Sequence, residues 1–248
     1  DAVIEDNSIV GFRAYTIDSS TSLTNITIRN NGPESPSKPH EGAGLLFRSA
    51  SWTSKGPAEI YDLVVQNSTG AGVVMAKGGA IGSNWTISDN RDNGISFVEF
   101  HPRVDILVSE DNLGSGVSVI GSSNVELSNV HTSGNGIGSS DSAGLYFQDS
   151  NYVMSGSKNV SCYSCYSEGD QRGIVVRDSI DLQLISTTIE GSLDEPALDS
   201  DNSGNLFSGL VILDDIAVNS PSSNYSVRLE GVDAEISGLD LSGNGGGM

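Results

Sequence analysis

The chain repeats one pattern of apolar and polar positions, in which a glycine is followed by a short run with alternating apolar residues. Residues 94–98, Gly-Ile-Ser-Phe-Val, form the central copy. Related runs begin 22 residues earlier at Gly72 and 22 residues later at Gly116. Two more begin at Gly144 and Gly173, after spacings of 28 and 29 residues, as if these repeats carried short insertions. A fixed period of this length indicates that one small structural unit is stacked repeatedly.

A second alternating run precedes each glycine and predicts another strand in every repeat. These runs lie at 63–65, 85–87, 106–108, 160–162 and 182–184. A polar turn separates each run from the glycine, as in Asn67, Asn90 and Asn112 with the polar residue before each. Asparagine suits this corner because it tolerates the left-handed conformation, and because its amide can bond to the same residue in the next repeat. Glycine fits the next corner for the same conformational reason.

A unit of about 22 residues with short strands, stacked at about 4.8 Å, is typical of one coil of a parallel β-helix. From its coil period, Asn turns and Gly-apolar runs, the chain resembles the right-handed parallel β-helix proteins over residues 8–241. This pectate-lyase-like superfamily includes polysaccharide lyases, pectin hydrolases, alginate epimerases and viral tailspikes. The resemblance implies an all-β fold, a single right-handed parallel β-helix solenoid of about nine to ten coils. It leaves the activity open, because function depends on sites placed on the fold.

We expect one domain over residues 1–248, with loop excursions at 33–41 and 50–57 and a glycine-rich tail at 243–248. Residues 1–10 show no amphipathic helix, and 232–241 have the pattern of one more coil. Solenoids need covered ends. The sequence therefore predicts a piece of a longer protein, or a partner at each end.

The alternation also predicts which side chains form the core. In the regular centre, the first and third residues after each glycine should point inward. These residues are Val73, Met75, Ile95, Phe97, Val117 and Val119. We expect Trp85 to share a core column with Leu63 and Ile106, which favours core packing over sugar stacking for its ring.

The charge balance excludes some functions. The chain has 32 Asp and Glu residues against 12 Lys and Arg, which gives a net charge of −20. Nucleic acid is therefore not an expected partner, because it requires a basic surface. Membrane insertion is not expected either, because no apolar stretch reaches 18 residues. The composition resembles proteins of extreme halophiles, where carboxylates keep the chain hydrated in concentrated salt. The alternative is an ordinary acidic secreted protein.

The outward positions of the glycine runs predict an apolar strip on this acidic surface. Its members are Leu46, Val74, Ala76, Val98 and Ile120. Exposed strips of this kind mark interfaces. Either a loop of the same chain covers the strip, or a second subunit does. For the second case, the resemblance to trimeric tailspikes implies a homo-oligomer, with a trimer favoured.

The residues just after these runs are the candidates for catalysis. A lyase of this superfamily would use a carboxylate cluster with Ca²⁺ and an Arg or Lys base, whereas a hydrolase would use two or three close Asp residues. The nearest approach to either set is Asp149, Asp170, Arg172, Arg177 and Asp178. Ladders of opposite charge on a solvated face explain the same residues. By register, Lys77 and Glu99 should lie one repeat apart, and His101, between Phe100 and Pro102, is predicted to be a turn residue.

Three further motifs are candidates for metal binding, for a disulfide and for glycosylation. Asp199 and Asp201 in an acidic loop suggest Ca²⁺, the only cofactor that the sequence indicates. Cys162 and Cys165 lack the further ligands that zinc needs, so they predict buried thiols or, outside the cell, a local disulfide. N-glycosylation sequons occur at Asn25, Asn67, Asn84, Asn159 and Asn224, although a chain this rich in Asn, Ser and Thr contains several by chance.

These patterns favour a non-enzymatic, extracellular β-helix segment of a larger surface assembly, such as a viral tail spike or fibre or a cell-surface adhesin. The loops that leave one corner of the coils, at 134–142, 167–172 and 191–201, would be presented to a glycan or a neighbouring subunit. The alternative is a polysaccharide lyase or hydrolase acting on an acidic glycan. The net charge opposes that alternative, because it repels a polyanion at low salt.

Overall fold

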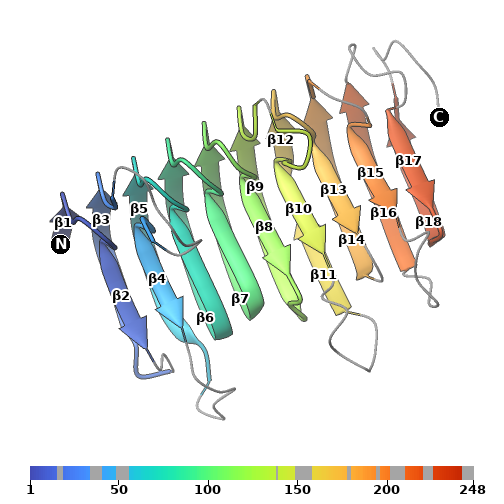
Figure 1. Cartoon of the computed structure of the whole chain (residues 1–248). Helices are drawn as coiled ribbons and strands as arrows, with labels where there is room; N and C mark the ends of the chain where they lie inside the picture. Colours follow the sequence, from blue (N-terminus) through green and yellow to red (C-terminus); the bar gives the residue numbers. More distant parts are fainter. Residues whose placement is uncertain are drawn as a thin grey trace.

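The protein is all-β. The computed structural model describes residues 1–15, 19–33, 41–48, 56–137, 139–148, 158–177, 180–193, 196–201, 210–219 and 226–241. These residues contain strands and no helix, and therefore no helix that could cross a membrane. Strands of successive repeats lie side by side, and the repeats follow one another from the N-terminus to the C-terminus (Figure 1). The predicted excursion at 50–57 lies largely outside this part, as do most of 33–41 and the whole tail.

In this part of the chain, eighteen strands form one continuous sheet whose strand pairs are parallel. The strands of the glycine runs are β2 (Phe12–Tyr15), β4 (Leu45–Arg48), β8 (Val117–Ile120), β10 (Leu145–Gln148), β13 (Ile174–Arg177), β15 (Leu198–Asp201) and β17 (Val227–Glu230), together with the first parts of β6 (Val73–Ser88) and β7 (Ile95–Glu110). The others are β1 (Ala2–Glu5), β3 (Ser22–Arg29), β5 (Ala58–Gln66), β9 (Val125–Ser133), β11 (Lys158–Tyr163), β12 (Tyr166–Glu168), β14 (Ile180–Glu190), β16 (Leu210–Asn219) and β18 (Asp233–Asp240). Strand β18 lies within residues 232–241, for which the sequence predicted one more coil.

Each strand pairs with its counterpart one repeat away, which confirms the predicted register. Val73 lies beside Ile95, and Ile95 lies beside Val117. Leu145 and Ile174 continue the same column across the longer repeats. The extra residues of those repeats therefore lie in the connections between strands, and the strands stay aligned.

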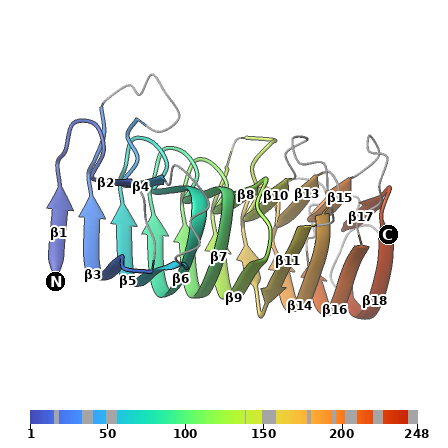
Figure 2. The ribbon, with the colours of Figure 1, turned by 90° about the horizontal axis from the view of Figure 1, so that it is seen from below.

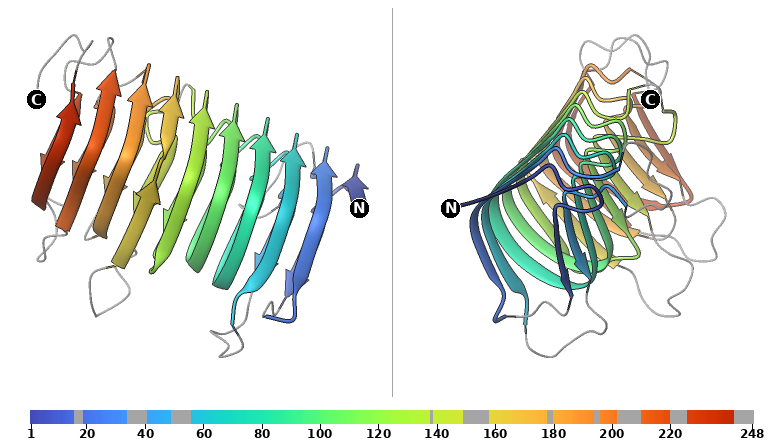
Figure 3. Two further views of the ribbon diagram at one scale, coloured as in Figure 1. Left: turned by 180° about the vertical axis from the view of Figure 1, so that it is seen from behind. Right: turned by 60° about the vertical axis from the view of Figure 1, so that its left-hand side comes forward.

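Two left-handed residues divide each of the two longest strands, β6 and β7, into three straight segments. In β7 they are Glu99 and Ile106, and in β6 they are Lys77 and Asn84. Each repeat thus contributes to three faces, which Figure 2 and the right-hand view of Figure 3 show as separate layers. We call them the glycine face (such as 95–98), the middle face (100–105) and the ladder face (107–110).

At the corner between the ladder face and the glycine face, two consecutive residues have different structural roles. The first is left-handed, with φ near 55° at Asn67, Asp89 and Asp111. The second is buried and bonds to the next repeat: the Asn90 side-chain amide donates to Asn112 Oδ1 (2.8 Å), and that of Asn112 donates to Asn135 Oδ1 (2.9 Å). The predicted asparagine ladder is therefore confirmed at Asn90 and Asn112.

Asn67 does not belong to this ladder, which corrects its predicted place. It is the exposed, left-handed residue of its corner, and Ser68 takes the buried position. The backbone N–H of Ser68 donates to Asn90 Oδ1 (2.9 Å). Sequence alone does not distinguish the two corner positions, because asparagine suits both of them.

The glycine before each run is required by close packing and not by a left-handed backbone. Gly94 has no positive φ. A Cβ at Gly94 would lie 2.7 Å from Asn112 Nδ2 and 2.6 Å from the carbonyl oxygen of Gly116. The strand begins so close to the asparagine ladder that a side chain cannot fit. The conformational reason that the sequence suggested for this glycine is therefore wrong.

The core lies between the three faces, and all six inward residues predicted for the glycine face are at most 1% exposed. Trp85 is also fully buried, and its indole N–H donates to the carbonyl oxygen of Ile60 (3.0 Å), which confirms its packing role. Its column contains Leu63 and Leu107. Ile106 is instead 47% exposed at a corner, so its predicted core position is wrong by one residue.

Ile106 should be replaceable with a gain in stability. It has a φ of 55°, which is unfavourable for a β-branched side chain, and Asn84 and Asn129 occupy the same corner of the flanking repeats. We expect Ile106→Asn to raise the free energy of unfolding by about 1 kcal/mol in urea titrations. The matched change Val108→Asn, in the extended ladder face, should lower it. A loss at both positions would contradict this assignment.

Cys162 and Cys165 form a disulfide, with their Cα atoms 5.9 Å apart. Both residues are buried, and the bond crosses the corner at Ser164, between the middle and ladder faces. Of the two alternatives that the sequence left open, the local disulfide is right and the free thiols are wrong.

Candidate functional site

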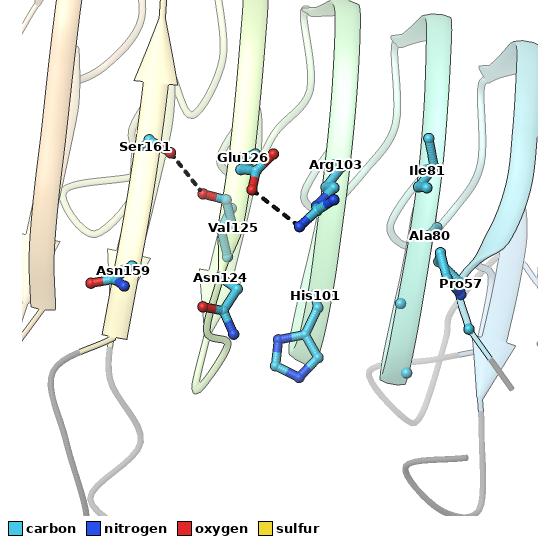
Figure 4. A pocket seen from close by; sticks show the side chains of 13 residues that line it. Pro57, Ala80, Ile81, His101, Arg103, Asn124, Val125, Glu126, Asn159 and Ser161 are labelled. Atoms are coloured by element: carbon cyan, nitrogen blue, oxygen red, sulfur yellow. Dashed lines mark hydrogen bonds and ion pairs between the residues drawn. The ribbon is translucent and has the colours of Figure 1, made fainter. Parts of the chain in front are cut away.

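An elongated groove lies on the outer side of the middle face. Its larger part has a volume of about 520 Å³, and a smaller part of about 230 Å³ adjoins it along the sheet. Asn159 and Ser161 line both parts. Figure 4 shows the larger part, with side chains from successive strands lying in a row. The side chains that line the groove include Ile81, His101, Arg103, Asn124, Glu126, Asn159, Ser161, Asp181 and Gln183.

Strand alternation places these side chains outside. Val125, Val160 and Leu182 point into the core and are at most 1% exposed. Their neighbours along each strand therefore point outward. The register then aligns Glu126 with Ser161, and Ser161 with Gln183. The groove is thus a row of polar groups separated by about 4.8 Å, the distance between neighbouring strands.

Most of the polar groups in the groove are neutral. Asn124, Asn159, Ser161 and Gln183 carry amides or a hydroxyl, which both donate and accept hydrogen bonds. The exception near the centre is an ion pair between Arg103 and Glu126, 3.3 Å apart and about half exposed on both sides. Groups of this kind match the hydroxyls of a sugar chain.

Asp181 adds a carboxylate to the smaller part of the groove. Its Oδ1 accepts a hydrogen bond from the backbone N–H of Leu210 (2.9 Å), the first residue of β16. This contact fixes one carboxylate oxygen against the neighbouring strand. Asp181 therefore contributes to the wall of the groove as well as to its polarity.

His101 lies at the edge of the groove, within β7 and not in a turn, so the turn assignment was wrong. Its Nδ1 contacts the carbonyl oxygen of Ser123 in the next repeat. The Ser123 hydroxyl also lies 3.2 Å from this nitrogen, so His101 is held against the next repeat by two contacts.

The predicted catalytic residues do not form a common site in the described part of the chain. Asp170 is fully buried in the asparagine ladder, where it accepts hydrogen bonds from Asn135, Thr132 and Ser167. Arg172 and Arg177 instead point toward Asp199. Asp149 and Asp178 lie outside the described residues.

Asp199 is surrounded by arginines, which does not fit the calcium role predicted for it. Its carboxylate is 1% exposed and lies 2.6 Å from Arg177, 2.7 Å from Arg228 and 3.6 Å from Arg172. Three guanidinium groups repel a cation and occupy the oxygens that would bind it. Asp201, 28% exposed, pairs with Arg228 (3.2 Å). Among the residues that the structure describes, no group of three or more His, Cys, Asp or Glu side chains could hold a metal ion.

The apolar strip is aligned as predicted but is less exposed than expected. Ala76, Val98 and Ile120 form one column of the glycine face, with Leu46 and Val74 in the neighbouring column. Leu46 is only 3% exposed, and the other four residues are half-buried. Leu46 thus adds almost no accessible surface, and the interface itself stays a prediction.

Two other surface predictions can be placed. Lys77 and Glu99 form the expected ion pair one repeat apart (3.8 Å). Four sequon asparagines, Asn25, Asn67, Asn84 and Asn159, are exposed, and Asn224 lies outside the described residues.

Sequence reasoning missed the groove. The available signal was the polar residue on either side of each inward Val or Leu, at 124–126, 159–161 and 181–183. The sequence predicted no site at these positions, because alternation does not show that the outer side of the strands is hollow. Compared with known proteins, the chain matches no family model, no curated protein and no solved structure.

Proposed function

We propose that the chain is a right-handed parallel β-helix of the pectate-lyase-like type, with about nine to ten coils. Three features support this architecture: the strand pairs among the described residues are all parallel, one register holds across unequal repeats, and a buried asparagine ladder follows one corner. Such ladders satisfy the polar groups of a sharp corner in every coil.

We infer that this β-helix binds a glycan without cleaving it, as an extracellular part of a surface or virion assembly. The observation that supports this function is the groove of the middle face, with its repeated neutral amides and hydroxyl. A sugar chain lying across the strands meets a polar side chain at each of β7, β9, β11 and β14, between Ile81 of β6 and Ile212 of β16. Among the described residues of the groove, the central carboxylate is paired with Arg103, which disfavours a pair of free catalytic carboxylates there.

The extracellular location has separate support. The disulfide between Cys162 and Cys165 is typical of an oxidising compartment. A net charge of −20 would keep the chain hydrated in concentrated salt, which supports the proposed halophilic source. A homo-oligomer, with a trimer favoured, remains our proposal for the apolar strip, and light scattering in molar salt tests it.

A binding panel tests the proposed function. The probes are soluble glucan, mannan, galactan and xylan, with polygalacturonate and alginate as acidic members, measured by affinity electrophoresis and calorimetry. We expect protein produced without N-linked glycans to bind at least one neutral polysaccharide, and Gln183→Ala should weaken this binding by roughly 3- to 10-fold, because one hydrogen bond is lost.

Gln66→Ala is the matched control, since Gln66 lies on the ladder face, where its amide donates to Ser88 (3.4 Å). This variant should bind like the parent protein. Equal losses for the two variants would place the site elsewhere. Release of new reducing ends from any probe would overturn binding without cleavage in favour of the enzyme.

A further inference from the structure

One glycosylation sequon lies inside the proposed binding groove. Asn159-Val160-Ser161 occupies β11, where alternation turns the asparagine and the serine outward while Val160 is 1% exposed. Asn159 and Ser161 are also the residues common to both parts of the groove. The acceptor amide and the sequon hydroxyl therefore both face the space in which a polysaccharide would lie.

We propose that Asn159 carries an N-linked glycan that covers the groove and excludes an external polysaccharide. This inference rests on the proposed function. A sugar on Asn159 Nδ2 starts at the centre of the row of polar groups, and neighbouring strands lie only about 4.8 Å away on each side. Its hydroxyls would meet Asn124 on one side and Asp181, the residue in register with Asn159, on the other. Because the glycan is covalently attached, its effective concentration at these groups far exceeds that of a free competitor.

The other described sequons differ from Asn159 in position or in bonding. The Asn84 side-chain amide, at a corner of the fold, donates to Asp62 Oδ1 (2.7 Å). Asn25 and Asn67 are exposed but are absent from both parts of the groove. Asn159 is exposed, and its side chain forms no hydrogen bond with the part of the chain that the structure describes. Its amide is thus accessible to modification, and the modification closes the groove.

The chemical step is an ordinary glycosyl transfer. The amide nitrogen of Asn159 bonds to the anomeric carbon of a pyrophosphate-activated oligosaccharide, the pyrophosphate leaves, and the nitrogen loses one proton. One N–H of the amide remains. The step needs no oxidant or reductant, and it requires the secretory environment that the disulfide also indicates.

The experiment compares glycosylated and unglycosylated protein by a readout that needs no polysaccharide. The full chain is produced in a glycosylating secretory host, with and without Asn159→Gln, and peptide mass spectrometry measures the occupancy of each sequon. A thiol is placed in the groove by Glu126→Cys, and a second thiol is placed outside it by Glu230→Cys. These glutamates match closely, with side chains 52% and 53% exposed. Alkylation by a maleimide-linked polymer then reports access to each position.

We expect Asn159 to be occupied, and the thiol at position 126 to react at least 10-fold more slowly than in the Asn159→Gln background, with no change at position 230. Asn84→Gln should change neither rate. An unoccupied Asn159 beside an occupied Asn84, or an occupied Asn159 without slower alkylation, would overturn the inference. Polysaccharide binding by the Asn159→Gln protein is scored separately: its absence would overturn the proposed function, whereas the alkylation rates still decide whether the glycan covers the groove.

Discussion

Asp199→Ala is expected to lower the free energy of unfolding by about 3–5 kcal/mol, because it leaves clustered positive charges without their buried partner. Asp199 accepts hydrogen bonds from Arg177 (2.6 Å) and from Arg228 (2.7 and 3.2 Å) while being 1% exposed. These bonds raise the pKa of Arg228, the direction expected when a cation is held by a buried anion. Urea titration of the purified chain measures the effect.

Glu230→Ala is the control for this prediction. Glu230 also pairs with Arg228, but at 3.9 Å and with half of its side chain exposed, so its removal should cost less than about 1 kcal/mol. The loss at Asp199 should persist in molar salt, because a buried pair is screened far less than a surface pair. A cost below about 1 kcal/mol for Asp199→Ala would show that the arginines are stabilised by other contacts.

Asp170→Asn is expected to stabilise the protein by roughly 1 kcal/mol at neutral pH, whereas Asp170→Ala should destabilise it by roughly 3 kcal/mol. Asp170 Oδ1 accepts the backbone N–H and the side-chain amide of Asn135, just as Asn135 Oδ1 accepts both groups of Asn112. An asparagine at position 170 keeps these bonds. Its amide can donate to Ser167, as the amide of Asn112 does to Ser109 (3.2 Å). Alanine leaves the buried donors of Asn135 without a partner.

The pH dependence of this effect has a definite sign. Burial raises the pKa of Asp170, and this effect outweighs the hydrogen bonds from Asn135, Ser167 and Thr132, which lower it. The folded state therefore holds this proton more tightly than the unfolded chain does. The proton on Asp170 stabilises the folded state fully at pH values below the pKa of Asp170 in the unfolded chain. This stabilisation is lost as the pH rises through the pKa of Asp170 in the folded state. The advantage of Asp170→Asn over the parent should accordingly shrink between pH 7 and pH 4. An advantage that grows on acidification would mean that Asp170 is stabilised as the carboxylate.

The local pattern determined the strands, their register and much of the core. Apolar alternation after Gly72, Gly94 and Gly116 predicted which residues pair and which point inward, because the side-chain period of a strand is two and the repeat is constant. The sequence predicted that asparagine side chains bond from one repeat to the next at this corner. It did not predict which of the two polar residues at each corner does so. At each corner two adjacent polar residues suit the turn, and only the packing of the next coil decides which one is buried, as Asn67 and Ser68 show.

Only the tertiary structure decided where the candidate site lies. Asp170, Arg172 and Arg177 seemed from the sequence to be one charged group, yet they belong to a buried ladder and to an ion cluster around Asp199, because coils of unequal length bring different residues together. The groove depends on strands from six repeats lying side by side, and four of them contribute Arg103, Glu126, Ser161 and Gln183. A sequence fixes which side of a strand faces solvent by alternation, whereas whether that side is hollow depends on the curvature and stacking of the whole sheet.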